Sequence, residues 1–307
     1  MLRFGILFQG AVLVSDSLTN RPRAGLHADA GCAIPCTYEG KAVSQREAAA
    51  MEALGVGKAK DIIVTQPVVE RYLAQLAQTH GLALPAVHMV QGVVVNPDYF
   101  DPELTRHGPR YGLGKEQLDV CFVAESYMPG AANKGFPEFI AAMQQLADLA
   151  CLRIHVVGGG YTPADLEVPG LHQRITYHGR LPTAQLRTFY AQMDLIVSPN
   201  RPGQLHAGNF DGFPTGACVE AALCEVAIMA TDALQQNPGY VDQQSIFLLD
   251  HDGEPVPQQI ERTVRHLAAH PEQLGQVASA CQRLTRTLYA PERQIATRQA
   301  ILRKAAP

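Results

Sequence analysis

The chain has 307 residues, of which 47% are hydrophobic and 18% are charged, and its formal net charge at pH 7 is -4. A chain of this length has room for about two domains of ~150 residues, each with enough apolar residues to bury a core. The slight acidic excess argues against non-specific binding to nucleic acid.

The cysteines indicate a reducing compartment. Seven are present, an odd and scattered set that does not suit a disulfide framework. Cys32 and Cys36 have no second Cys or His pair to accompany them, which argues against zinc because a structural zinc site usually takes four ligands. Residues 1–14 are apolar but shorter than the ~20 residues of a membrane helix, and no cleavage signal follows them. We expect a cytoplasmic protein that opens on a buried strand.

The first part of the chain is predicted to alternate between strands and helices. A short strand is expected over 11–14. A helix over 44–54 begins with Ser44 and Glu47 at the spacing of a capping box. A second helix, over 67–78, has proline in its first turn. The remaining apolar runs cover 32–38, 61–65 and 87–95.

Residues 96–117, which are rich in proline, glycine and charge, are predicted to be a linker. The alternation is clearer beyond them. The expected strands cover 119–124, 152–157, 175–177, 195–198 and 227–230, and the expected helices 136–149, 184–193 and 220–224. This order predicts a parallel sheet covered on both faces, with ligands at the carboxyl ends of its strands.

The loop from Asp211 to Gly216 is the strongest candidate for a binding site. It leads directly into an apolar helix that carries Glu220. Such a loop presents backbone N–H groups and a positive dipole end to phosphate, and carboxylates can accept hydrogen bonds from sugar hydroxyls. Lys134 is a source of the cation that a diphosphate requires. These residues predict a nucleotide-sugar site; the alternative is an ordinary loop with a solvated Asp211 and Thr215 as a helix cap.

Five segments of the second half stand in the order found in one known family. They are Phe122-Val123-Ala124 with Lys134-Gly135, Ile154 to Gly160, Tyr177 to Leu181, Leu186 to Pro199, and Asp211-Gly212-Phe213 with Glu220-Ala221-Ala222. Together they resemble the nucleotide-sugar domain of the glycosyl transferases group 1 family, which are retaining enzymes with the GT-B architecture of two facing Rossmann-like domains. The resemblance covers residues 85 to 250 well and the N-terminal part loosely.

The resemblance implies an α/β, GT-B-like fold with two Rossmann-like domains, each built on a parallel sheet. It places a partial acceptor-side domain at 1–95, the linker at 96–117, a nucleotide-sugar-binding domain at 118–290 and a C-terminal helix at 291–307. The opening strands of the family's first domain have no match here. We therefore expect an incomplete N-terminal domain; a missing N-terminal segment and a homo-oligomer are both left open.

The resemblance also implies roles for side chains. Lys134 would bind the donor diphosphate, where negative charge grows on the leaving group. Asp211 would bind hydroxyls of the transferred sugar, and Glu220 would hold the hydroxyls of the ribose. Members of the family require no metal at this site, so neither a metal ion nor a cofactor is expected.

The main chain is expected to contribute as well. By the same resemblance, Gly212 and Phe213 would let backbone amides approach the phosphates or the sugar. Gly179, Arg180 and Leu181 would frame the base through main-chain contacts.

Three positions depart from the family pattern. Glu125 stands where a phosphate-binding arginine is expected, and it would repel a diphosphate by ~1 kcal/mol or more at about 4 Å. Arg201 is one candidate for the replacement cation. The acid motif is one residue longer than usual and begins with Asp211, whose shorter side chain requires the loop to shift. Glu39 stands where the family often has a histidine.

Three functions remain open. The first is a glycosyltransferase that moves a sugar from a nucleotide-sugar donor to a polysaccharide or lipid-linked acceptor. The second is a catalytically inactive or fragmentary relative that binds nucleotide sugars as a partner module, which Glu125 and the short first domain favour. The third is a nucleotide-sugar epimerase or a nucleotide-dependent oxidoreductase, although the dinucleotide-binding glycine fingerprint is missing.

The C-terminal helices carry many arginines. We expect most of them to form a solvated face, with peripheral contact to an anionic membrane at the inner face as the alternative. They are Arg262, Arg265, Arg283, Arg286, Arg293, Arg298 and Arg303.

Overall fold

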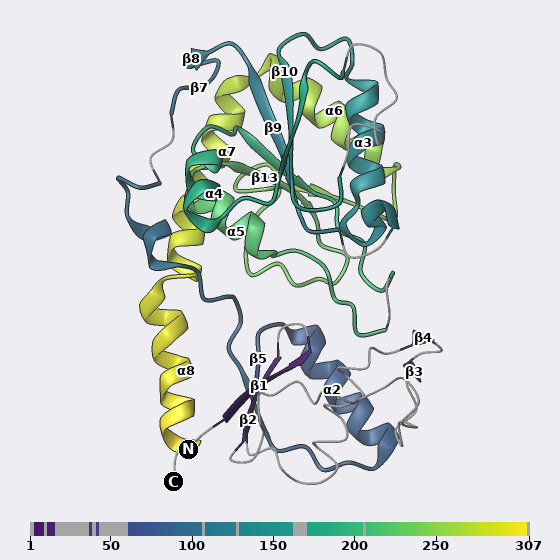
Figure 1. Ribbon diagram of the computed structural model, residues 1–307, viewed down its shortest axis with the longest axis vertical. Helices are drawn as coiled ribbons and strands as arrows, with labels where there is room; N and C mark the ends of the chain where they lie inside the picture. The colour runs from purple at the N-terminus through teal and green to yellow at the C-terminus, as the bar shows by residue number, and fades with distance from the viewer. Residues whose placement is uncertain are drawn as a thin grey trace. The chain divides into compact units, whose positions relative to one another are not determined.

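The computed structural model describes residues 3–8, 11–15, 37–38, 41–42, 61–105, 108–126, 129–161, 171–204 and 207–305. The chain divides into two compact units (Figure 1). Unit 1 consists of Met1–Val94, Gly203–Phe210 and Pro291–Pro307, and unit 2 of Val95–Pro202 and Asp211–Ala290. The predicted helix over 44–54, Cys32, Cys36 and Glu39 lie outside the described residues.

Unit 1 contains a four-stranded sheet in the order β1-β2-β5-β6. Its strands are β1 (Arg3–Phe8), β2 (Ala11–Ser15), β5 (Asp61–Val64) and β6 (Ala86–Met89). The prediction of a parallel sheet is wrong for this unit, because β1–β2 and β2–β5 pair antiparallel and only β5–β6 pair parallel. The single strand expected within 1–14 is two strands. The short connection between β1 and β2 allows these two strands to pair only antiparallel, whereas the helix between β5 and β6 allows a parallel crossover.

The helix that makes this crossover is α2 (Pro67–His80), which confirms the helix predicted over 67–78. Proline occupies its first turn, and it ends at Gly81, whose φ of 61° is the left-handed conformation that glycine tolerates. Unit 1 also contains the short antiparallel pair β3 (Thr37–Tyr38) and β4 (Lys41–Ala42), and the helix α8 (Pro291–Ala305). Arg298 of α8 donates to the carbonyl of Gly92 at 3.0 Å, which ties this helix to the segment after β6.

Unit 2 contains a six-stranded sheet in which every pair is parallel, as the alternation of elements predicted. The order is β11-β10-β9-β12-β13-β14. The strands are β9 (Leu118–Val123), β10 (Leu152–Val157), β11 (Ile175–Gly179), β12 (Leu195–Ser198), β13 (Ala227–Thr231) and β14 (Phe247–Leu249). Chain order reverses between β9 and β12, so the crevice at their carboxyl ends is where a ligand is expected in an open α/β sheet.

Helices cover both faces of this sheet. They are α3 (Phe136–Gln145), α4 (Thr183–Tyr190), α5 (Gly216–Leu223), α6 (Val256–Ala269) and α7 (Pro271–Leu288). On one face, Phe139 of α3 and Ile260 of α6 share a buried core with Val120 of β9. On the other face, Phe189 of α4 packs edge-on against His155 of β10. Figure 1 shows α3 and α6 together on one side of the sheet, with α4 and α5 on the other.

The segment predicted as a linker has structure of its own and groups with unit 2. It contains the 3-10 helix η1 (Pro97–Phe100) and the paired strands β7 (Arg110–Tyr111) and β8 (Gly114–Lys115). A second 3-10 helix, η2 (Pro129–Lys134), follows β9. Arg286 of α7 donates to the carbonyl of Phe100 at 3.0 Å, and Tyr99 is fully buried. Burial of this aromatic ring gives the segment a fixed place on unit 2.

Two further features of the described residues bear on the chemistry. Four thiols are buried and unoxidised, namely those of Cys121, Cys218, Cys224 and Cys281. None of the helices in the described part of the chain is long and apolar enough to cross a membrane.

Candidate functional site

The loops that follow β9 and β12 are in close contact at the point where strand order reverses. Gly135 has a φ of 73°, and a Cβ atom at this position would lie 1.9 Å from the carbonyl oxygen of Pro199. The amide of Arg201 donates to the carbonyl of Asn133 at 3.0 Å. Only glycine allows this approach, which places Lys134 next to the carboxyl end of β12.

Asp211 is held by two side chains from the loop after β9. Asn133 Nδ2 donates to Asp211 Oδ2 at 2.7 Å, and Lys134 Nζ donates to Asp211 Oδ1 at 2.5 Å. Asp211 is only 4% exposed, and Asn133 is fully buried. The carboxylate therefore has a charged partner and an amide partner, as a buried charge requires. The sequence motifs indicated Lys134 and Asp211 but not the anchoring role of Asn133.

The rest of the loop from Asp211 to Gly216 is held in place by packing and by a helix cap. Phe213 is 1% exposed, and its ring meets that of Tyr240 edge-on with centroids 5.4 Å apart. A Cβ atom on Gly212 would lie 3.1 Å from Leu234. Thr215 caps α5 by accepting a hydrogen bond from the Cys218 amide at 3.2 Å. The capping role of Thr215 is thus confirmed, whereas the alternative of a solvated Asp211 is wrong because two neighbours bury it.

Glu220 lies one turn into α5. Burial raises the pKa of Glu220 to about 6, and the hydroxyl of Tyr99 opposes that rise. The charge of Glu220 also acts on Tyr190 and Cys224, both of which are buried. Sequence reasoning missed Tyr99, because nothing distinguishes it within a stretch that has the composition of a linker.

The carboxyl ends of β9, β10 and β11 meet at a second cluster of charge. Arg180, which is 77% exposed, donates from Nε to Glu125 Oε2 at 3.0 Å, and the amide of Gly159 donates to the same oxygen at 3.2 Å. Gly179 has a φ of 64°, and its carbonyl accepts from the Gly158 amide at 2.9 Å. Leu181, the last of the three residues predicted to frame the base, is half-buried.

Arg201, the suggested replacement cation, is engaged elsewhere. It pairs with Glu138 of α3 at 2.7 Å. The cation that accompanies Glu125 is Arg180, which stands 55 positions further along the chain. A pairing over that separation leaves no local signal in the sequence.

A chain of polar side chains crosses the α4 face of the sheet. Lys115 Nζ pairs with Asp119 Oδ2 at 2.9 Å, and Asp119 Oδ1 lies 2.7 Å from His155 Nε2. His155 Nδ1 in turn lies 3.1 Å from His178 Nε2, and Phe189 packs against both imidazoles. Burial lowers the pKa of His178, and the neighbouring His155 lowers it further. His155 is thus a packed residue of β10.

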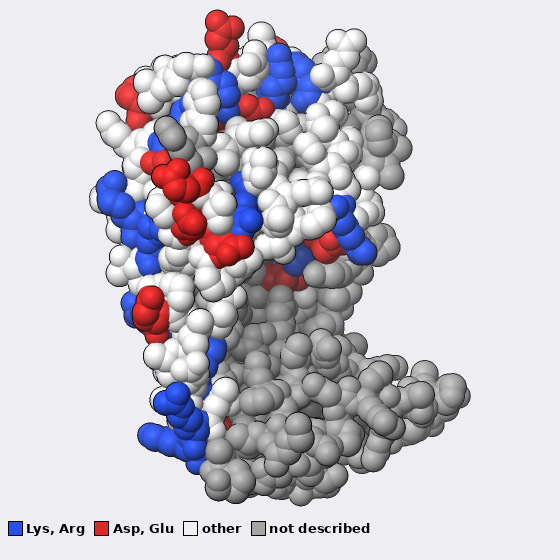
Figure 2. Space-filling view, turned by 60° about the vertical axis from the view of Figure 1, so that its left-hand side comes forward, with Lys and Arg blue, Asp and Glu red and all other residues white. Residues whose placement is uncertain are grey.

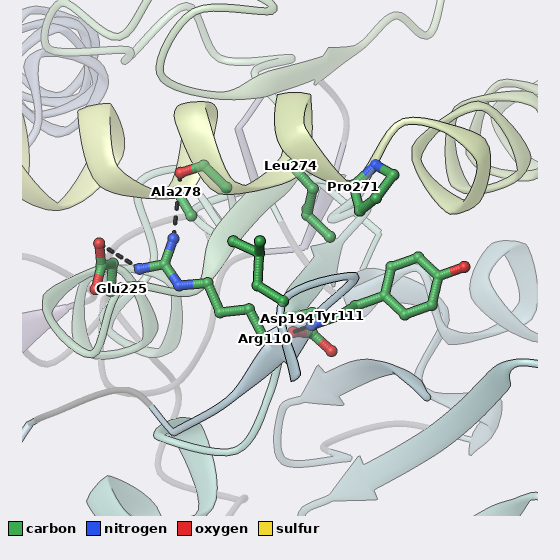
Figure 3. Close-up of a pocket in the computed structure, with 9 residues that line it drawn as sticks. Arg110, Tyr111, Asp194, Glu225, Pro271, Leu274 and Ala278 are labelled. Carbon is green, nitrogen blue, oxygen red and sulfur yellow. Dashed lines mark hydrogen bonds and ion pairs between the residues drawn. The ribbon is translucent and has the colours of Figure 1, made fainter. Parts of the chain in front are cut away.

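A small pocket lies at the opposite ends of the strands, away from their carboxyl ends. Figure 3 shows Arg110 reaching across it to Glu225, with Leu274 and Ala278 of α7 above. Glu225 precedes β13, and Asp194, which also lines the pocket, precedes β12. These are amino ends of parallel strands, so this pocket does not include the residues predicted from the motifs.

Most arginines of the C-terminal helices are exposed, as expected, namely Arg262, Arg283, Arg293 and Arg303, and several of the seven have protein partners. Arg265 pairs with Asp148 and Glu261, Arg262 with Glu254, and Arg286 and Arg298 donate to backbone carbonyls. Figure 2 shows Lys and Arg beside Asp and Glu over the described part of this view. The basic residues Arg303 and Lys304 lie in the last turn of α8.

Residues 118–270 match the family model described as Glycosyl transferases group 1. Through this segment the chain belongs to the glycosyl transferases group 1 family. The matched residues contain the whole six-stranded sheet together with Lys134, Asp211 and Glu220. No curated protein matches the chain.

Solved glycosyltransferase structures share the fold at low sequence identity. Sucrose-phosphate synthase from Thermosynechococcus elongatus is 18% identical with a TM-score of 0.60, over 85% of this chain and 62% of that one. WaaG, a glycosyltransferase of lipopolysaccharide biosynthesis, is 15% identical with a TM-score of 0.59, over 82% and 66%. Anabaena HepE in complex with UDP-glucose is 16% identical with a TM-score of 0.55, over 82% and 66%.

The chain spans less than two thirds of the length of each of these three structures. At such identities the likeness establishes the fold alone. The GT-B-like α/β fold class predicted from the sequence is confirmed, with the mixed sheet of unit 1 as the departure from it.

Proposed function

We propose that this protein is a glycosyltransferase that moves a sugar from a nucleotide-sugar donor to a glycan or lipid-linked acceptor. The observation that carries the proposal is the buried contact of Lys134 with Asp211 at the point where strand order reverses. Membership in the family supports the reaction type. The complex of HepE with UDP-glucose and the role of WaaG in lipopolysaccharide biosynthesis suggest the chemical classes of donor and acceptor.

In this proposal Lys134 stabilises the departing diphosphate. Its side chain is 11% exposed, and an ammonium group in so dry a setting acts on developing charge more strongly than one in water. Asp211 holds this ammonium in place and accepts hydrogen bonds from hydroxyls of the transferred sugar. Gly212 and Phe213 belong to the same loop as Asp211, and the ring of Phe213 fixes this loop in the core. We propose that protein groups carry this charge without a metal ion.

Glu220 is proposed to bind the ribose hydroxyls. A carboxylate accepts hydrogen bonds from both hydroxyls of a ribose, whereas a protonated carboxyl offers one donor in place of an acceptor. Because the pKa of Glu220 is about 6, donor affinity should weaken as the pH falls through this value. Gly179, Arg180 and Leu181 are proposed to frame the base.

A second candidate is a relative that binds nucleotide sugars without transferring them. Glu125 favours this candidate, since its charge opposes a diphosphate unless a cation compensates it. Arg180 provides such compensation at 3.0 Å, which leaves transfer as the better-supported function.

The test is a thermal-shift panel of UDP, GDP, dTDP and their sugars, followed by product analysis with the donor that binds. Stabilisation by one nucleotide with sugar transfer or slow donor hydrolysis supports the transferase. Binding without turnover on any acceptor supports the second candidate. If none of these nucleotides stabilises the full chain, both candidates are wrong.

A further inference from the structure

We propose that Arg180 binds a phosphate of the donor diphosphate through its guanidinium group, with Glu125 acting as the positioning residue that aims it. This inference rests on the proposed function and goes beyond it, since the family resemblance gives residue 180 only main-chain contacts.

The Arg180 side chain extends from the end of β11 toward the loop that follows β9. Its backbone follows β11, yet its Nε reaches Glu125, two residues beyond the end of β9. β10 lies between these strands, so the side chains of Arg180 and Glu125 together bridge about two inter-strand spacings of ~4.8 Å. The guanidinium therefore lies over the end of β10, one strand away from the reversal of strand order between β9 and β12.

Gly159, after β10, leaves room for this path. A Cβ atom on Gly159 would lie 3.0 Å from Arg180 Nε, 3.3 Å from its Nη2 and 3.1 Å from Glu125 Oε2. The ion pair thus passes directly over the glycine. The same residue donates its amide to Glu125, so the bare backbone that admits the side chain also fixes its partner.

The turns beneath are rigid. A Cβ atom on Gly158, which has a φ of 134°, would meet the carbonyl oxygen of Ala124 at 1.8 Å. The amide of Gly158 bonds to the carbonyl of Gly179, and that of Ser126 bonds to the carbonyl of Gly159. Backbone contacts therefore join the ends of all three strands and hold Glu125 and Arg180 in register.

Both hydrogen bonds from Arg180 to Glu125 leave from Nε. Among the described residues, its terminal nitrogens make no hydrogen bond, although the guanidinium has five N–H donors in a planar fork. Glu125 thus fixes one side of the fork, and the four remaining donors stay available. That geometry suits two oxygens of a phosphate group.

The other cations of this edge are strongly committed, Lys134 to Asp211 and Arg201 to Glu138, and Lys134 is 11% exposed. Arg180 is 77% exposed, which makes it accessible to an incoming anion. A diphosphate that met Glu125 alone would be repelled. When Arg180 lies between Glu125 and the diphosphate, the carboxylate holds the guanidinium in place. The diphosphate then meets a cation instead of an unpaired negative charge.

The experiment is isothermal titration of the full chain with UDP, GDP, dTDP and inorganic pyrophosphate, at low and high salt. Arg180→Gln should weaken binding of the nucleoside diphosphate that the wild type prefers by about 10- to 100-fold, since hydrogen bonds to charged groups are of that strength. The affinity of Arg180→Lys for this nucleotide should lie between those of the wild type and of Arg180→Gln. The loss should shrink at high salt, because an exposed charge is screened.

Arg265→Gln is the matched control. Arg265 is an exposed arginine with two carboxylate partners on unit 2, Asp148 and Glu261, so its loss removes at least as many ion pairs away from this edge. It should leave nucleotide affinity unchanged. Gly159→Val should displace the fork without changing any charge, and it should weaken binding in the wild type but add nothing in the Arg180→Gln background.

Each outcome decides between the proposals. If Arg180→Gln binds the diphosphate as the wild type does while Lys134→Ala does not, the inference is wrong and the proposed function stands. A loss in Arg180→Gln that is independent of salt and equalled by Arg265→Gln also overturns the inference, since it marks a structural effect. If the wild type binds none of the four probes, both the inference and the proposed function are wrong.

Discussion

Asp119 and His155 are joined by a hydrogen bond of 2.7 Å, and this contact sets the proton positions along a chain of two histidines. A carboxylate can only accept, so His155 Nε2 carries the proton, and its Nδ1 then accepts from Nε2 of His178 when both rings are neutral. Burial tends to raise the pKa of Asp119, but hydrogen bonds from His155 and Lys115 outweigh it and lower the pKa.

We expect Asp119→Asn to destabilise the protein by roughly 1–3 kcal/mol at pH 7, because the amide offers His155 and Lys115 no charge. A carboxyl with a lowered pKa stabilises the fold above its unfolded-state pKa, and that contribution is lost as the pH falls through its folded-state value. The difference between variant and wild type should therefore shrink in acid. Urea unfolding across this pH range measures it. Asp148→Asn is the control, since it removes an exposed partner of Arg265, and equal losses in the two variants would contradict the prediction.

Lys134→Ala should lower kcat/KM about 100-fold or more, as the loss of one stabilising donor in a transition state does. It should also cost about 2–3 kcal/mol of stability, because Asp211 loses the charged side chain that pairs with it in a buried setting.

The double variant Lys134→Ala/Asp211→Asn separates the two effects. Removing the orphaned charge should restore most of the stability while activity stays low. Recovery of both quantities in the double variant would show that Lys134 serves the fold and not the reaction.

Donor affinity should depend on pH through Glu220. Because the pKa of this carboxyl is about 6, the ionised fraction falls about tenfold per pH unit well below that value, and the affinity should follow. Nucleotide titrations between about pH 5 and pH 8 test this. Glu220→Gln should bind weakly at all these pH values, with a flat profile.

Tyr99→Phe should move this profile. The hydroxyl of Tyr99 lowers the pKa of Glu220 against the effect of burial, so its removal should raise the pKa and start the loss of affinity at a higher pH. A variant with weaker binding and an unshifted profile would mean that Tyr99 contributes packing alone.

Gly135→Ala and Gly179→Ala form a matched pair. Both glycines have positive φ, which costs an alanine about 1–2 kcal/mol, but a Cβ atom on Gly179 meets nothing within 4 Å whereas one on Gly135 meets the Pro199 carbonyl at 1.9 Å. Gly135→Ala should therefore be less stable than Gly179→Ala by at least about 1–3 kcal/mol, the usual cost of overpacking. Equal stabilities would mean that the loops after β9 and β12 separate easily.

Much of unit 2 was predictable because its strands are continuous apolar runs that parallel sheets bury on both faces. The predictions over 152–157 and 195–198 coincide with β10 and β12, and that over 119–124 differs from β9 by one residue at each end. The mixed sheet of unit 1 was not predictable in this way, since apolar runs carry no sign of strand direction.

The candidate site was predictable only where residues stand close together in the chain. The glycine loop and Glu220 form one local motif, and Lys134 stands in a segment that resembles the family. The partners that fix these residues come from far away, such as Asn133 for Asp211 and Arg180 for Glu125. Such pairings depend on strand order, which motif spacing does not encode.

Alkylation of the four buried thiols can be used to detect the unfolding of unit 2. Burial raises the pKa of Cys121 and of Cys218, and it does the same for Cys224 and Cys281, so each is protonated and shielded while unit 2 is folded. Only the thiolate attacks an alkylating reagent. Labelling of these positions, followed by mass spectrometry, would therefore measure the fraction of molecules in which the core of unit 2 has unfolded. A bound donor would slow this labelling.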